Sequence, residues 1–141
     1  MAEIPKELFD EISEIALTIV NAGSIGDDAV AESAYIRLRE LHEKITRVGQ
    51  VYPFFTEVLG DFTRDNAESV RLFKQAIEQS ISDSSEPLHT KMFSLAETLI
   101  EMGRVEEAEA YLVAARPHAS KHGDSEALED IDHLLRRIAQ K

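Results

Sequence analysis

The chain contains no cysteine, and this absence removes a whole class of stabilising and catalytic chemistry. Without thiols there are no disulfide bonds, no thiolate nucleophiles and no cysteine-ligated zinc sites. A chain of 141 residues, 43% of them hydrophobic, must therefore be held together by an apolar core. That length suits a single domain spanning residues 1–141. The absence of cysteine also agrees with a reducing compartment.

Long apolar segments are absent as well. No run approaches the roughly 20 apolar residues that a membrane-spanning helix requires. The first residues carry acidic side chains throughout and show neither the basic nor the apolar region that is typical of a signal peptide. We therefore expect a cytoplasmic protein that does not insert into a membrane.

Basic residues are scarce: 15 of them face 27 acidic residues, which gives a formal net charge of −12. A surface of this sign repels the phosphates of nucleic acids and of anionic lipids, so neither is an expected partner. The same charge attracts a cationic protein over long distances. A simpler interpretation also stays open, because the acidic residues are spread along the chain and would in any case keep a small protein soluble.

The sequence does contain helical periodicity. Apolar residues recur at steps of three and four almost everywhere, which places them on one face of a helix. Capping residues, prolines and glycines then suggest the boundaries. The expected helices begin near Pro5, Asp27 or Asp28, Pro53, Asp65 or Asn66, Pro87, Val105 and Ser125. Seven helices joined by short loops, without a competing strand pattern, predict an all-α domain.

Three details of these helices are specific enough to test. Pro117 should end or kink the sixth helix, because proline lacks an N–H and collides with the carbonyl group four residues earlier. If the helix continues, Gly123 is a later stop. Val48 in the second helix and Ile81 in the fourth fall on the stripes of apolar residues that are expected to point inward.

Small and large residues alternate at fixed spacing within these helices. The clearest case covers residues 93–116 and contains Leu95, Ala96, Leu99, Gly103, Ala108, Leu112 and Ala115. The same small-large-small spacing recurs at Ser69, Phe73 and Ala76, and more loosely at Ala31, Tyr35 and Leu38. A small residue on each of two helices lets their backbones approach closely, while the larger residue fills the groove beside it.

These residues resemble the tetratricopeptide repeat. That family combines Leu-Gly/Ala on a first helix, a turn glycine, and Ala-x3-Phe/Tyr/Leu-x2-Ala on a second helix. Residues 93–116 match well, residues 54–79 match in their second half, and residues 12–41 match more weakly. The resemblance implies about seven antiparallel helices stacked as a short α-solenoid, with the last helix as a C-terminal cap. An ordinary helical bundle with this spacing by chance is the alternative.

Catalytic and metal-binding patterns are weak. His118 and His122 have the spacing of two ligands on one helix face, but no third ligand is evident. Asp130 and His133 lack the further carboxylates of a di-iron bundle. His42 lies near a lysine, as in helical phosphotransfer domains, but the surrounding pattern differs. With no phosphate-binding glycine loop or nucleophile arrangement, we expect no enzymatic activity, no metal and no other cofactor.

The resemblance also implies a binding surface, because in this family the first helix of each pair lines a concave groove. The residues that it places on the groove side are Phe93, Glu97, Ile100, Glu101, Glu57 and Asp61. Ile100 lies off the core stripe, so it is either an apolar anchor inside an acidic rim or a contact with the last helix. Some members of the family clamp a partner's C-terminal carboxylate with basic residues, but here the region is acidic, so we expect no such clamp.

The predicted function is a non-enzymatic protein–protein interaction module that binds a basic protein or peptide surface. Because the chain has no room for a second module, a dedicated inhibitor is the alternative, such as an immunity protein that neutralises a cationic toxin. A homodimer whose groove is filled by a second copy is the third possibility. The sequence does not separate these three interpretations.

Overall fold

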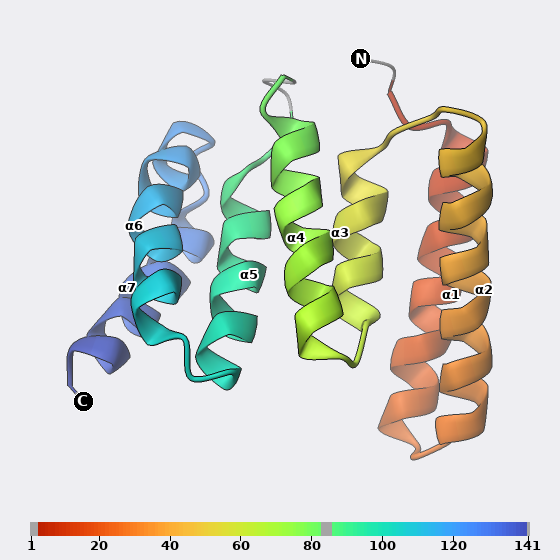
Figure 1. The fold of residues 1–141 in the computed structure, drawn as a ribbon, viewed down its shortest axis with the longest axis horizontal. Coiled ribbons are helices and arrows are strands. Elements are labelled where there is room, and N and C mark those ends of the chain that lie inside the picture. Colours follow the sequence, from red (N-terminus) through yellow and green to blue (C-terminus); the bar gives the residue numbers. More distant parts are fainter. Residues whose placement is uncertain (1–2, 83–85, 141) are drawn as a thin grey trace.

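The computed structural model describes residues 3–82 and 86–140, and within them every regular element is an α-helix (Figure 1). The seven helices are α1 (Lys6–Ser24), α2 (Asp28–Arg47), α3 (Pro53–Phe62), α4 (Asn66–Ser80), α5 (His89–Glu101), α6 (Val105–Lys121) and α7 (Ser125–Ala139). This confirms the prediction of an all-α fold. None of the helices in the described residues has the length and apolar composition needed to cross a bilayer.

The helices follow one another across the molecule in chain order, and neighbours run in opposite directions (Figure 1). The most extensive contacts form the pairs α1/α2, α3/α4 and α5/α6, and α7 packs against the open side of α6. Between pairs, α4 packs broadly against α5, whereas the contact of α2 with α3 is much smaller. The helices are therefore stacked in series, as predicted, with α7 covering the last pair.

The α5/α6 pair is packed through small side chains. Ala96, Ala108 and Ala115 have no exposed surface. The turn between the helices contains Gly103 at φ +77°, a backbone conformation that glycine adopts at little cost. The N–H of Arg104 donates to the carbonyl oxygen of Leu99 at 2.8 Å and thereby closes the end of α5. The expected close approach of the two helices is confirmed.

The α3/α4 pair is joined by a turn of the same length, residues 63–65, and it also packs closely. A Cβ atom on Gly60 would lie 2.8 Å from the ring of Phe73, so the two helices meet where no side chain separates them. The hydroxyl group of Ser69 lies 3.1 Å from the carbonyl oxygen of Gly60 and 2.8 Å from that of Thr63. These bonds satisfy carbonyl groups at the end of α3.

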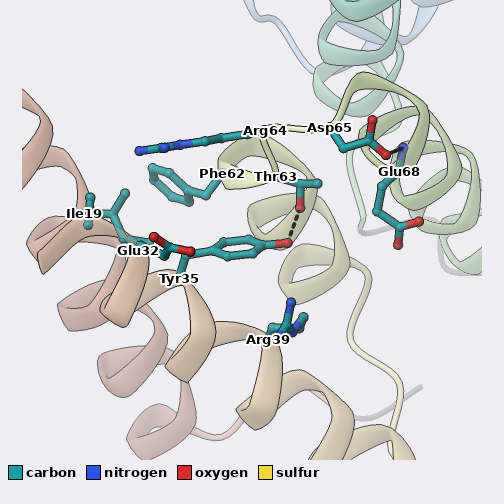
Figure 2. A pocket seen from close by; sticks show the side chains of 10 residues that line it. Ile19, Glu32, Tyr35, Arg39, Phe62, Thr63, Arg64, Asp65 and Glu68 are labelled. Atoms are coloured by element: carbon teal, nitrogen blue, oxygen red, sulfur yellow. Dashed lines mark hydrogen bonds between the residues drawn. The ribbon is translucent and has the colours of Figure 1, made fainter. Parts of the chain in front are cut away.

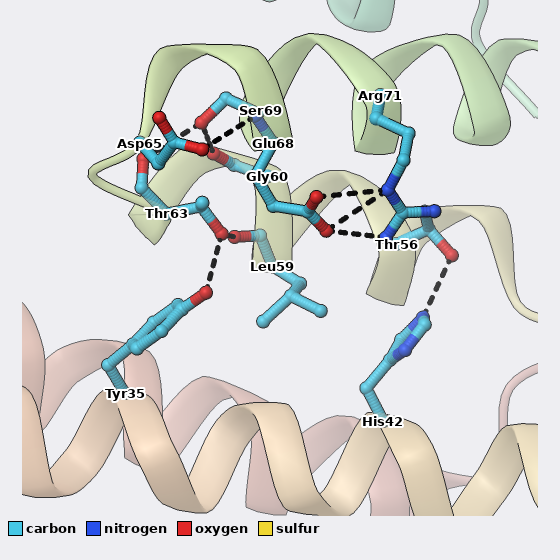
Figure 3. A network of polar contacts seen from close by, with 10 residues as sticks. All are labelled: Tyr35, His42, Thr56, Leu59, Gly60, Thr63, Asp65, Glu68, Ser69 and Arg71. Carbon is cyan, nitrogen blue, oxygen red and sulfur yellow. Dashed lines mark hydrogen bonds and ion pairs between the residues drawn. The ribbon is translucent and has the colours of Figure 1, made fainter.

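Two side-chain hydrogen bonds connect α2 to α3 (Figures 2 and 3). Tyr35 donates its hydroxyl proton to Thr63 at 2.8 Å, because the hydroxyl group of Thr63 itself donates to the carbonyl oxygen of Leu59. Nε2 of His42 lies 3.1 Å from the hydroxyl oxygen of Thr56. Tyr35 and His42 are two helical turns apart, and so are their partners Thr63 and Thr56, in the reverse order along the chain. The two bonds therefore fix an antiparallel register. We call these two bonds and the helix faces that carry them the α2–α3 joint.

The N-terminal pair is longer than its neighbour. Helices α1 and α2 contain 19 and 20 residues, whereas α3 contains 10. The turn between α1 and α2 therefore projects beyond α3 and α4, as Figure 1 shows. The buried hydrophobic residues form two clusters that meet along α4: one contains Ile12, Leu38 and Phe55, and the other contains Leu95, Leu112 and Ile131.

Four details differ from the sequence-based expectations. Helix α6 does not end at Pro117 but runs on to Lys121, because the carbonyl group that proline frees belongs to the exposed residue Val113 and can be hydrated. Val48 and Ile81 were expected to be buried but follow the ends of α2 and α4, and both are exposed. Helix α5 begins two residues after Pro87.

Candidate binding surface

Three of the predicted groove residues come together between α3 and α5. Asp61 projects from α3, and Glu97 and Glu101 project from α5, one turn apart. They line a common cavity of about 220 Å³, whose wall also includes Ser94 and Thr98. We call the cavity and these three carboxylates the acidic groove. Within the described part of the chain none of the three carboxylates forms an ion pair.

The carboxyl group of Asp61 is held in an unfavourable environment for its charge. Asp61 is exposed at the surface, but surrounding protein atoms partly desolvate its carboxyl group, and this desolvation is the main reason that its pKa rises to about 7. The negative charges of Glu57 and Glu97 raise the pKa further, whereas a hydrogen bond from Ser94 and the positive charge of Lys91 lower it. Close to neutral pH, this group is therefore divided between its protonated and ionised forms.

Glu97 is perturbed in the same direction. Burial is the largest cause of its raised pKa, and the charges of Glu101 and Asp130 add to it. Asp130 belongs to α7 and was not among the predicted groove residues. The acidic groove therefore receives negative charge from three helices, and the sequence pattern on α3 and α5 alone does not reveal the contribution of α7.

Glu57, also predicted to line the groove, is already neutralised. Its carboxylate lies 3.3 Å from Nζ of Lys91, whose side chain is almost completely buried. The same ammonium group donates to Glu86 at 3.1 Å and to the carbonyl oxygen of Pro87 at 2.8 Å. A buried lysine requires such partners, because an unpaired charge in the interior is very costly. Lys91 thus connects α3 to the start of α5.

The sequence did contain a signal for this network. Lys91 lies three residues after Leu88 and four before Leu95, so it occupies a core position of an amphipathic helix. A charged residue at such a position predicts a buried ion pair, but the partner cannot be identified from the helix pattern alone.

Phe93 and Ile100 lie apart from the acidic groove. Both are half-buried and pack against the C-terminal core, which supports the interpretation of Ile100 as a packing residue. Phe93 lines a separate cavity of about 280 Å³ together with His89, Asp124 and Asp130. The predicted set of six residues is therefore divided among the groove, an ion pair and the α5–α7 contact.

His89 is a buried residue that the sequence analysis missed. Its Nε2 atom lies 2.9 Å from a carboxylate oxygen of Asp124, and its ring lies 5.4 Å from that of His122. Asp124 also accepts the N–H of Ala127 and so caps α7. The backbone hydrogen bond, followed by the one from His89, lowers the pKa of Asp124. These contacts fasten the start of α5 to the start of α7.

The structure also describes the surroundings of the histidines considered for chemistry. No group of three or more potential metal ligands occurs in the described residues. His42 is half-buried and stacks edge-on against Phe55, with 4.9 Å between the ring centroids. Burial is the main cause of its lowered pKa, followed by the charge of Arg71, whereas Glu43 raises it. Its contacts connect helices within the fold rather than present a nucleophile to solvent.

No family model, curated protein or solved structure matches the chain. The tetratricopeptide resemblance therefore stays a prediction from residues 93–116. Any function proposed for the chain depends on the geometry and charge of its own surfaces.

Proposed function

We propose that the protein is a non-enzymatic interaction module whose acidic groove binds a basic protein or peptide surface. The observation that carries this proposal is the convergence of Asp61, Glu97 and Glu101 around one cavity without a basic partner. Two other carboxylates that lie between helices are neutralised: Glu57 by Lys91, and Asp132 by Arg116 at 2.6 Å. An inserted lysine or arginine side chain would provide the missing charge.

The perturbed carboxyl groups give this proposal a thermodynamic basis. Burial and mutual repulsion make the ionised forms of Asp61 and Glu97 unfavourable, as their raised pKa values indicate. A cation in the groove stabilises the ionised forms, so it lowers both pKa values and releases protons. Binding should therefore strengthen as the pH rises through about 7, the pKa of Asp61.

The alternative function, inhibition of a cationic toxin, uses the same contacts. It differs only in the identity of the partner, because an inhibitor would cover a basic active or receptor-binding surface. A homodimer that fills the groove is less favourable, since each copy carries a formal charge of −12. The proposal keeps the tetratricopeptide-like arrangement and a cytoplasmic location as predictions.

The test compares two triple variants that remove the same charge. The first, Asp61→Asn with Glu97→Gln and Glu101→Gln, neutralises the acidic groove. The second, Glu106→Gln with Glu109→Gln and Glu129→Gln, neutralises exposed carboxylates outside it. The measurement is the affinity for a fluorescent arginine-rich octapeptide at about 0.05 M and about 0.3 M salt.

The groove variant should bind at least about tenfold more weakly, because each lost charge-assisted contact contributes about 1 kcal/mol or more. The control variant should bind within about twofold of the unchanged protein. Equal losses in the two variants would show that only the overall charge matters, and would contradict the groove as the site. Circular dichroism establishes that both variants keep their helices.

The proton linkage gives a second measurement on the same peptide. For the unchanged protein, affinity should increase between pH 6 and pH 8, because Asp61 becomes ionised over this range. The single variant Asp61→Asn should lose most of this increase. An affinity that is independent of pH in the unchanged protein would contradict the participation of Asp61.

A further inference from the structure

A second cavity lies on another part of the molecule, where the N-terminal pair meets the turn between α3 and α4. Its volume is about 430 Å³, within the range of about 300–1,000 Å³ that is typical of small-molecule sites. Ile19 and Ala31 line one side, and the aromatic rings of Tyr35 and Phe62 line the interior. Apolar and polar groups contribute about equally to its lining, and it is a different cavity from the acidic groove, although Thr63 borders both.

Charged side chains surround this cavity, but most of its carboxylates already have partners. Asp65 caps α4 by accepting the N–H of Glu68. The carboxylate of Glu68 binds the guanidinium group of Arg71 through both oxygens. Figure 2 shows Asp65 and Glu68 on the far side of the turn from the two rings. Of the carboxylates that line the cavity, Glu32 forms no hydrogen bond or ion pair in the described residues.

The two arginines that line the cavity have free donors. Arg39 makes no hydrogen bond or ion pair within the described residues, and its guanidinium carbon lies 5.9 Å above the ring of Tyr35. Arg64 approaches Asp28 only to 3.9 Å, and both side chains are more than 70% exposed. In Figure 2 the two arginines lie on opposite sides of the Phe62 and Tyr35 rings.

This arrangement differs from that of three other arginines. Arg71, Arg104 and Arg116 each bind both oxygens of a carboxylate on a nearby helical turn or helix. In a protein with 27 acidic residues, two arginines that flank one cavity without such a partner retain their full capacity to bind an anion.

We infer that this cavity binds a planar aromatic group that carries a carboxylate. The ring occupies the space beside Tyr35 and Phe62, and the carboxylate receives hydrogen bonds from Arg39 or Arg64. A carboxylate fits better than a dianionic phosphate, because Glu32 and the net charge of −12 repel the second negative charge more strongly. Such a ligand is either a free small molecule or the C-terminal aromatic residue of a peptide.

The absence of tryptophan from the chain makes a direct test possible. The fluorescence of N-acetyl-tryptophan reports its own binding, since the protein contributes no tryptophan signal. We expect saturable binding with a blue-shifted emission, and no binding of N-acetyl-tryptophanamide, which lacks the carboxylate. Tetrapeptides ending in tryptophan, with a free or an amidated C-terminus, distinguish the peptide source from the free small molecule.

Matched variants test the assignment to this cavity. The double variant Arg39→Gln, Arg64→Gln should weaken binding at least tenfold, which corresponds to about 1.4 kcal/mol. Arg37→Gln removes an exposed arginine from the same helix, outside the cavity, and should leave binding within about twofold. Arg37 lines a different groove with Glu40 and Lys44, so it controls for a general loss of positive charge.

Three results would overturn the inference. The first is an absence of saturable binding by both the acid and the tetrapeptide. The second is equal binding of the acid and the amide, which would indicate an apolar cavity without anion recognition. The third is an equal loss of affinity in the Arg37→Gln variant and in the double variant. Because the acidic groove is not involved, these results are independent of those obtained with the arginine-rich peptide.

Discussion

The two ends of the helical stack differ in how their helices are held. The last three helices share a core of fully buried residues, including Ala108, Leu112 and Ile131, and the bidentate pair of Arg116 with Asp132 joins α6 to α7. The N-terminal pair shares a buried cluster with α3 through Ile12, Leu38 and Phe55, but its contact with the next pair is smaller, and the two hydrogen bonds of the α2–α3 joint add to it. Packing, rather than helix length, therefore determines which end is more firmly fixed.

Surface composition shows the same contrast. Ten large hydrophobic side chains are exposed in the described residues, and seven of them lie between Phe9 and Val51. The exposed face of α7 consists of polar residues, as expected for a helix that caps a stack. We therefore expect the N-terminal pair to open at a lower free energy than α5 and α6.

The largest expected effect comes from enlarging a small buried residue at each end. Ala108→Leu places three extra carbon atoms between α5 and α6, where there is no free space, and should destabilise the protein by about 3 kcal/mol. Ala31→Leu is the matched change, and it should cost less than about 1 kcal/mol because Ala31 borders the cavity of about 430 Å³. Urea unfolding measures both values.

Equal destabilisation by the two leucines would contradict the proposed difference in packing. A result in which Ala31→Leu is the more harmful change would reverse it.

A smaller effect should follow from adding one methyl group to a glycine. Gly60→Ala brings a Cβ atom to 2.8 Å from the buried ring of Phe73, so the variant should lose about 2 kcal/mol of stability. Gly23→Ala, at the end of α1, meets no atom within 4 Å and should gain about 0.5–1 kcal/mol. In thermal unfolding, the melting temperature of Gly60→Ala should be lower than that of the unchanged protein, and the melting temperature of Gly23→Ala should be higher.

The smallest expected effect is a loss of stability at the α2–α3 joint when the pH is lowered. Because burial lowers the pKa of His42, the folded state binds fewer protons than the unfolded state as the pH falls below the ordinary value of 6.5. Stability contributed by neutral His42 is therefore present above 6.5 and lost as the pH falls through the lowered pKa. Hydrogen exchange, corrected for intrinsic rates, should show α1 and α2 losing protection before α5 and α6.

The variant His42→Gln provides the control, because glutamine does not titrate. It should remove the additional loss of protection in α1 and α2 below pH 6.5, the ordinary pKa of histidine. Uniform loss of protection along the chain would show that acid acts on the protein as a whole.

Much of the fold could be predicted from local patterns. The helix starts at Asp28 and Asn66, the turn at Gly103 and the burial of Ala96 and Ala108 all follow from capping, backbone conformation and spacing. These features depend on residues close together in the chain. The continuation of α6 through Pro117 could not be predicted in the same way, because it depends on which face of the helix meets water.

The candidate site was less predictable, because its chemistry depends on which helices become neighbours. The resemblance implied that Asp61, Glu97 and Glu101 face the same way, and in the structure these three residues line one cavity. The contribution of Asp130 and the neutralisation of Glu57 arise from contacts between residues far apart in the chain. Spacing within one helix contains no information about such contacts.

The projecting end of the N-terminal pair gives the molecule a mechanical property. Asp28, the first residue of α2 at this end, lies about 16 Å along the helix axis from the middle of the α2–α3 joint, at a rise of about 1.5 Å per residue. A rotation of about 10° at the joint would therefore displace this tip by about 3 Å, while the bonded side chains near the pivot move far less. The distance between one label on the tip and another on α4 would therefore report rotations that cause too small a displacement to detect at the joint itself.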